Sequence, residues 1–234
     1  GTGALSTANQ DDNDGTVAIG HLACKVQAGT GGDQFANATV GIGYKALTAL
    51  TSGSSNTAIG YESMVASTTG GGNTAYGYQS LHGDTDGDGA DNTALGHKAL
   101  HDAISPSKNV AIGDSAMRVM NGTANGIANC VAIGANAFYG DATNTTTGAN
   151  GTVAIGKSAL ADLTSGGSNT AVGFEAGTNV TTGGLNTFVG YLSGHGLDGS
   201  APLTGAYNTC LGEESGYLLQ GAAHSNTCVG QGAG

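Results

Sequence analysis

One glycine-centred phrase recurs along the whole chain, and this repetition constrains the fold more than any other feature. The segment TVAIGKSAL at 152–160 is followed by NTAVGFEAG at 169–177, in which similar residue types occupy the same places. We number each repeat from the glycine that ends its VAIG-like segment and call this residue the repeat glycine. The base spacing between repeat glycines is 17 residues, and longer spacings reach 23. The twelve repeat glycines are Gly20, Gly43, Gly60, Gly77, Gly96, Gly113, Gly134, Gly156, Gly173, Gly190, Gly212 and Gly230.

The residues around each repeat glycine alternate in a way that predicts a short β-strand. Val or Thr stands three residues before it, a small residue stands two before in most repeats, and Ile, Leu or Val usually stands one before. This period of two is typical of strands, and the glycine is expected at a kink or a close backbone approach. Ala or Ser three residues after the glycine, followed in most repeats by Leu, Met or Phe, predicts a second short strand. The Gly- and Ser-rich remainder predicts a turn, and helices are expected to be scarce.

Two short strands in a period of 17 residues predict one coil of a parallel β-solenoid, so we expect an all-β fold of about twelve coils. Adjacent coils stack at about 4.8 Å, which gives a rod of roughly 55–60 Å. We assign residues 1–15 to an N-terminal lead or first partial coil and residues 16–234 to a single β-roll domain. Residues inserted beyond the base period are expected to project from one side of the rod.

The alternation also suggests an orientation for the strands. The Val/Thr and Ile positions are expected to fill the interior of each coil, and the Ala, Gly and Ser positions are expected to form an exposed face. Small residues allow another backbone to approach closely, so we expect several chains to pack around a common axis and bury that face. The alternative is a monomeric solenoid in which the Ala and Gly residues serve tight internal packing.

The repeated phrase resembles a known family. NVAIG (109–113), TVAIG (16–20 and 152–156) and NTAIG (56–60) resemble repeats in the heads of YadA-like trimeric autotransporter adhesins. The segment GSSNTAIGYESM (53–64) is also similar to repeats of phage tail fibres and related surface fibres. The resemblance extends from about Thr16 to the last residue. It implies a left-handed parallel β-roll, a homotrimer and a place on an extracellular appendage or virion fibre.

Composition argues against several classes of function. The formal net charge is −11, which disfavours contact with phosphate backbones, so no nucleic-acid partner is expected. No segment approaches the roughly 20 consecutive apolar residues that span a bilayer, so we expect no membrane insertion by this segment. Neither a P-loop nor a GxSxG nucleophile motif is present. We therefore expect the chain not to be an enzyme and to require no cofactor.

The sharpest local motif is HGDTDGDGADN at 82–92. Asp84, Asp86 and Asp88, followed by Gly89, match the opening of a calcium-binding loop, and Asp91 could supply another oxygen. The match is partial, because Leu95 stands where an EF-hand loop has Glu. Calcium is therefore the one cofactor that the sequence suggests, and the competing interpretation is a solvated acidic loop.

Two of the four cysteines, Cys210 and Cys228, occupy the same place in successive repeats, where most repeats have Ala. They are expected to be stacked neighbours. A disulfide between them is conceivable, but small buried apolar side chains are the favoured interpretation.

The leading functional hypothesis is a rigid, non-enzymatic extracellular fibre or adhesin head module whose variable loops attach to a host-surface protein or glycan. The longest insertions, at 24–38, 82–91, 121–129, 139–150 and 194–207, are the candidate contact loops. The alternative is a purely structural subunit of a self-assembling extracellular filament. A third hypothesis, ice binding by the Thr residues three before some repeat glycines, is disfavoured because Val interrupts the row of Thr residues and because we expect that face to be buried.

Overall fold

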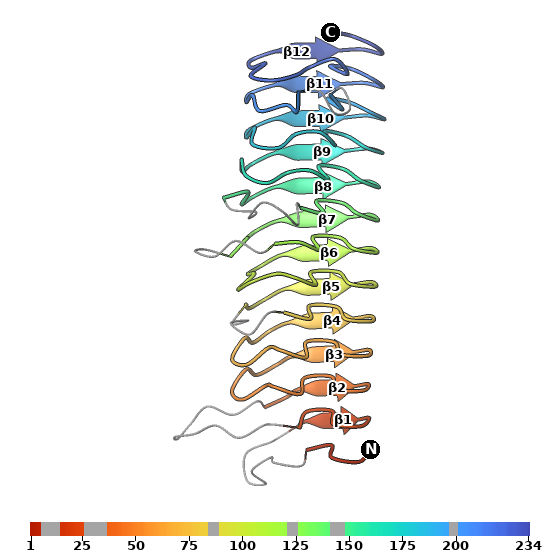
Figure 1. The fold of residues 1–234 in the computed structure, drawn as a ribbon, viewed down its shortest axis with the longest axis vertical. Helices are drawn as coiled ribbons and strands as arrows, with labels where there is room; N and C mark the ends of the chain where they lie inside the picture. The colour runs from red at the N-terminus through yellow and green to blue at the C-terminus, as the bar shows by residue number, and fades with distance from the viewer. Residues whose placement is uncertain (6–14, 26–36, 84–88, 121–125, 141–147, 197–200) are drawn as a thin grey trace.

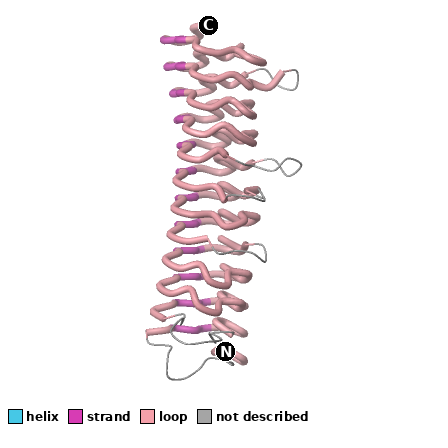
Figure 2. The backbone as a smooth tube through the Cα atoms, turned by 90° about the vertical axis from the view of Figure 1, so that its left-hand side faces the viewer, coloured by secondary structure: helices cyan, strands magenta, loops and turns pink. Residues whose placement is uncertain are grey.

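The computed structural model describes residues 1–5, 15–25, 37–83, 89–120, 126–140, 148–196 and 201–234, and these residues build one parallel β-solenoid (Figure 1). Twelve strands lie one above another along the rod, and the described ranges contain no helix. The expected all-β solenoid is therefore confirmed. Figure 2 shows that the strands line one side of the rod.

Each strand consists of the three residues that immediately precede a repeat glycine. Every strand pairs in parallel with the next one, and the pairing joins equivalent positions, so that Ala111 lies opposite Ala132. Gly113 and Gly134 are 21 residues apart, yet their strands pair in the same register as strands 17 residues apart. Insertions therefore leave the register unchanged. The strands are β1 (Val17–Ile19), β2 (Val40–Ile42), β3 (Thr57–Ile59), β4 (Thr74–Tyr76), β5 (Thr93–Leu95), β6 (Val110–Ile112), β7 (Val131–Ile133), β8 (Val153–Ile155), β9 (Thr170–Val172), β10 (Thr187–Val189), β11 (Thr209–Leu211) and β12 (Thr227–Val229).

The expected orientation of the strands is wrong. The central residue of each strand, most often Ala, points into the solenoid, where it is buried in β2 to β12 and half-buried in β1. The residues on either side of it face outward and are half-buried or exposed. In the repeats from Gly43 to Gly156, the interior opposite the strand holds a bulky side chain four residues after the repeat glycine, such as Leu100 or Met117, both fully buried. Only a small residue fits between that side chain and the strand, so the larger Val and Ile residues point outward.

The repeat glycines are required by the close stacking of the chain. From Gly20 to Gly212 their φ angles lie between 129° and 145°, a region that L side chains rarely adopt. A Cβ atom on Gly156 would overlap the carbonyl group of Gly173 in the next repeat, and the same holds along the column. The expected close backbone approach is confirmed.

The second short strand expected after the repeat glycine is not formed in the described residues. The residues two and four positions after the glycine are left-handed, as in Lys98 (φ 55°) and Leu100 (φ 52°), so the segment curls into a turn. Its amides still join successive repeats. The N–H of Lys98 donates to the Tyr78 carbonyl (2.9 Å), and the N–H of Leu100 donates to the Ala116 carbonyl (3.0 Å). These bonds and the burial of Leu100 offset a left-handed cost of about 1–2 kcal/mol per residue.

A column of buried asparagines stabilises the start of the strands and was not expected from the sequence. The main-chain N–H of Asn92 donates to Asn73 Oδ1 (2.9 Å), and its side-chain amide donates to the Pro106 carbonyl (2.7 Å). Asn92 Oδ1 in turn accepts the N–H of Asn109 (3.1 Å). Each asparagine thus satisfies buried polar groups of its own repeat and its neighbours. The column comprises the buried Asn56, Asn73, Asn92, Asn109, Asn169, Asn186 and Asn208 and the half-buried Asn226, and Cys130 and Thr152 interrupt it.

Candidate binding surfaces

The outward side chains of the twelve strands form one continuous surface, which we call the strand face. It consists of the first and third residues of each strand, which are Val, Thr, Ile, Leu or Tyr, and none is charged. Several are exposed to a degree unusual for large apolar side chains: Ile19 is 56% exposed, Tyr76 55% and Val229 65%. Large apolar side chains therefore lie beside Thr side chains along the strand face. The Thr residues of this face are half-buried or exposed in the single chain, so their expected burial, one of the two reasons against ice binding, is wrong. The other reason stands, because Val interrupts the row of Thr residues at β6 to β8.

Aromatic rings extend this surface beyond the repeat glycines. The residue after the glycine is aromatic in five successive repeats, and the rings stack in the order His21, Tyr44, Tyr61, Tyr78 and His97, with centroids 5.0 to 5.6 Å apart. Each ring covers the faces of its neighbours, so the inner members present edges and hydroxyl groups outward.

Two further rows of side chains run along the turn. The proximal row contains the residues two positions after each repeat glycine, and the distal row contains the residues five positions after it. Long side chains of these rows meet in several repeats. Glu62 lies 3.8 Å from Lys45 Nζ and 4.0 Å from His82 Nε2, and Glu175 Oε2 lies 3.7 Å from His195 Nε2.

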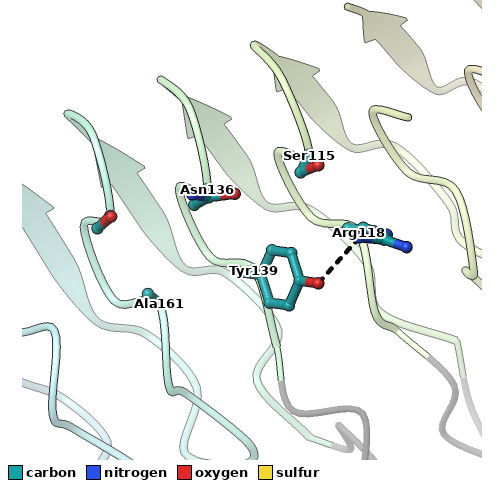
Figure 3. A pocket seen from close by; sticks show the side chains of 6 residues that line it. Ser115, Arg118, Asn136, Tyr139 and Ala161 are labelled. Carbon is teal, nitrogen blue, oxygen red and sulfur yellow. Dashed lines mark hydrogen bonds between the residues drawn. The ribbon is translucent and has the colours of Figure 1, made fainter. Parts of the chain in front are cut away.

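A pocket opens between the two rows where three successive proximal residues are short. Its volume is about 360 Å³, and Figure 3 shows the side chains that line it. The proximal row contributes Ser115, Asn136 and Ser158, and the distal row contributes Arg118, Tyr139 and Ala161. Stacking of repeats places these six side chains together although they span 47 positions of the sequence, from 115 to 161.

The electrostatics of the pocket centre on Arg118, the sole arginine of the chain. Its Nη1 donates to the Tyr139 hydroxyl (3.1 Å), and its Nε lies 3.9 Å from Asp102 Oδ2. A hydrogen bond from His101 lowers the pKa of Asp102, and the nearby charge of Arg118 acts in the same direction. Asp102 is therefore ionised at neutral pH and partly neutralises the guanidinium. Arg118 Nε is buried and makes no hydrogen bond within the described part of the chain.

Of the four predicted calcium ligands, the structure describes Asp91 alone. Asp84, Asp86 and Asp88 lie outside the described residues. Asp91 is described, and its N–H donates to the Gly71 carbonyl (3.0 Å) from a left-handed conformation (φ 59°). No group of three or more His, Cys, Asp or Glu suited to a metal occurs within the described ranges. Calcium binding at 84–91 therefore stays a prediction.

The cysteines lie in the interior. Cys210 and Cys228 pair in register on β11 and β12, as expected, and both are buried free thiols. Burial raises the pKa of Cys210 to about 12, and the adjacent Cys228 thiol adds to the shift. Burial alone raises the pKa of Cys24 to about 11. These thiols are therefore unreactive packing groups at neutral pH.

The sequence-based prediction missed both the asparagine column and the pocket. Asn directly precedes eight of the twelve strands, a regularity as marked as that of the Ala positions, and it could have indicated a buried ladder. The pocket has a weaker signal. The proximal row changes from Lys, Glu and Gln to Ser, Asn and Ser at Ser115, Asn136 and Ser158, and the sole arginine stands beside this change.

A scan of protein-family models, a search of curated proteins and a search of solved structures each found no match to this chain. Among the described residues, no helix reaches the length and apolarity that crossing a bilayer requires.

Proposed function

We propose that this chain is a non-enzymatic extracellular fibre or adhesin head module, a rigid rod of about twelve coils that presents variable loops for attachment to a surface or host. The single observation that carries this proposal is the strand face, which is uncharged along the whole rod and combines Val, Ile, Leu and Tyr with Thr at the first position of seven strands. A surface of that kind fits permanent burial against other copies of the chain. A left-handed β-roll assembled as a homotrimer follows from the sequence resemblance and gives the strand face its partner.

The division of each repeat into a constant and a variable part supports the attachment role. The strand, the repeat glycine and the turn keep nearly the same length in every repeat, and the insertions occur between the turn and the next strand. The constant part forms the ladders of hydrogen bonds, so the variable part can change without disturbing the rod. Its partners in this proposal are other copies of the chain and a host-surface protein or glycan. The location is a cell-surface appendage or a virion fibre.

The mass of the protein in solution tests the assembly. We expect light scattering to give about three times the chain mass of 22.6 kDa. The substitutions Leu95→Glu and Ile133→Glu place charges on the strand face of β5 and β7 and are expected to yield folded monomers. A matched control is Ser54→Glu, on an exposed connecting segment away from the strands, which should leave the mass unchanged. A monomeric mass for the unaltered chain would overturn the trimer.

The second candidate is a purely structural filament subunit, and the uniform register favours it. Every pair of neighbouring strands joins equivalent residues of successive repeats, so the pairing that stacks repeats within a chain can also stack one chain on another. Electron microscopy distinguishes the two candidates. End-to-end filaments favour the structural subunit, and discrete short rods favour the head module.

A further inference from the structure

We propose that the pocket at Ser115, Arg118, Asn136, Tyr139, Ser158 and Ala161 binds one neutral pyranose unit of a glycan. The inference deepens the attachment role proposed above by naming a ligand class and a site on the constant part of the rod. It does not depend on whether the chains assemble, so the two proposals can fail separately.

The pocket exists because of a local change in side-chain size. In other repeats the proximal row carries Glu62 or Glu175, and each meets a distal histidine. In the three repeats from Gly113 to Gly156 the proximal residues are too short to reach across. The resulting cavity of about 360 Å³ lies at the small end of the range for ligand pockets, about 300–1,000 Å³, and suits a single sugar ring.

The ring of Tyr139 offers an apolar surface inside this pocket. Arg118 Cζ lies 5.7 Å from its centroid on one side, and the neighbour in the distal row on the other side is Ala161. In Figure 3 the ring lies between these two residues, its hydroxyl points toward Arg118, and one ring face is turned toward the viewer. The methyl group of Ala161 is too small to cover the ring, in contrast to the distal pair His195 and Tyr217, whose rings stack with centroids 5.1 Å apart. An uncovered ring face can pack against the C–H face of a pyranose.

Polar groups surround this apolar surface. The side chains of Ser115, Asn136 and Ser158 line the proximal side, and no hydrogen bond of these three side chains occurs within the described ranges. They offer two hydroxyl groups and one amide, each able to donate and to accept. Arg118 adds donors beyond the one engaged by the Tyr139 hydroxyl. One apolar face with a rim of donors and acceptors complements the C–H face and hydroxyl edge of a sugar.

The charges favour a neutral sugar over an acidic one. Asp102 lies 3.9 Å from Arg118 Nε and already partly neutralises the guanidinium. Asp114 precedes Ser115, Asp162 follows Ala161, and the formal net charge of the chain is −11. Lys157 precedes Ser158, so the pocket is flanked by two cations, Arg118 and Lys157, and by three carboxylates, Asp102, Asp114 and Asp162. A ligand carboxylate would therefore enter a net negative potential.

Ligand-observed NMR with the intact chain tests the proposal. The probes are the methyl glycosides of glucose, galactose and N-acetylglucosamine, with methyl glucuronide as the acidic comparison. We expect saturation transfer to at least one neutral glycoside, with affinity about tenfold or more above that for the glucuronide. Absence of binding by all three neutral probes, or stronger binding of the glucuronide, would overturn the proposal.

Variants locate the binding. Tyr139→Ala removes the ring and Ala161→Leu fills part of the pocket beside it, and each should weaken binding by about tenfold or more. The matched control is Tyr217→Ala, which removes a distal-row tyrosine outside the pocket and should leave binding unchanged. Circular dichroism confirms that the variants fold, and the two pocket variants act by opposite changes in volume. Binding that survives both pocket variants, or that is lost equally in Tyr217→Ala, would place the sugar elsewhere and refute the assignment.

Discussion

The solenoid fills its interior in two ways, and the difference separates the repeats from Gly43 to Gly156 from the last four repeats. In the first region the centre of the strand is Ala or Gly, and the residue four positions after the repeat glycine is a buried Leu, Met or Phe. In the second region that later residue is always Gly, and much of the volume comes from the strand, as Phe188, Cys210 and Cys228.

The contacts show that the two positions share one space. A Cβ atom on Gly177 would lie 2.8 Å from Phe188 Cδ2 and 2.9 Å from Leu160 Cδ2, and one on Gly194 would overlap the Phe188 ring. Likewise, a Cβ on Gly216 would overlap the Cys210 thiol. The strand centre and the position four residues after the repeat glycine therefore compete for the same interior space, within one repeat at Phe188 and Gly194 and between neighbouring repeats at Phe188 and Gly177. Glycine also removes the cost of a left-handed side chain, because Gly177 and Gly194 have φ of 63° and 60°.

The largest expected effect comes from removing the ring that fills the second region. Phe188→Ala leaves a cavity bordered by Gly177 and Gly194, which have no side chains to fill it, and should lower the free energy of unfolding by about 3–5 kcal/mol. Urea denaturation measures the loss. The control is Phe174→Ala, because the Phe174 ring is 38% exposed and stacks on Tyr191 at the surface. Equal losses in the two variants would contradict the packing described here.

Exchanging the two packing arrangements gives the next largest effect. Gly194→Leu alone places a side chain where the Phe188 ring lies and puts a leucine on a left-handed backbone. It should lower the free energy of unfolding by about 2–4 kcal/mol. The double variant Phe188→Ala with Gly194→Leu recreates the arrangement of the first region. It should lose about 1–3 kcal/mol less than the sum of the single variants in a double-mutant cycle. Strict additivity would show that the two positions do not share a space.

The asparagine column offers a smaller, stabilising change. Thr152 interrupts the column, and its Oγ1 is buried without a hydrogen bond in the described chain. Thr152→Asn supplies an acceptor for the Asn169 N–H, as Asn169 Oδ1 does for Asn186 (2.9 Å), and should raise the free energy of unfolding by about 1 kcal/mol. Thr170→Asn, at an outward position of β9, is the control and should give no gain. A loss of stability in Thr152→Asn would contradict the role assigned to the column.

The smallest expected effect is a loss of stability at alkaline pH that arises from the buried thiols. Burial raises the pKa of Cys210 from 9.0 to about 12 and that of Cys24 from 9.0 to about 11. Between pH 9 and the raised pKa values the folded thiols keep protons that the unfolded thiols lose. The free energy of unfolding therefore has its full value below pH 9 and falls as the pH rises toward 11–12.

Urea midpoints at pH 8 and pH 10.5 measure this contribution. The unaltered chain should lose more stability over that interval than Cys24→Ala/Cys210→Ala, and tyrosine ionisation affects both chains alike. An equal loss in the two proteins would show that the thiols do not titrate differently in the folded state.

The period, the strands and the close approach at the repeat glycines could be predicted from the sequence, because each recurs in twelve copies and averages out local irregularities. The inward face could not be predicted from alternation alone, since both faces of a strand such as Val110–Ile112 are apolar. The inward face is set by the bulky Leu or Met seven residues after the first residue of the strand, because this side chain leaves room for only a small residue at the strand centre. The pair Phe188 and Gly194, where the large and small residues are exchanged, shows in the sequence that these two positions are in contact. The second strand was mispredicted because small and bulky residues also alternate in this turn, where Leu100 is left-handed. The pocket escaped prediction because it depends on side chains of three different repeats.

The constant register described above means that distance along the rod is counted in repeats and not in residues. Gly134 and Gly156 are 22 residues apart and Gly156 and Gly173 are 17 apart, yet each pair of strands is separated by the same spacing of about 4.8 Å. The repeat to which a residue belongs therefore fixes its position along the rod axis. A residue on the turn of a given repeat therefore stays at a fixed height along the rod when the loops above and below it lengthen or shorten. Groups on the turns of different repeats keep their spacing whatever the lengths of the loops between them.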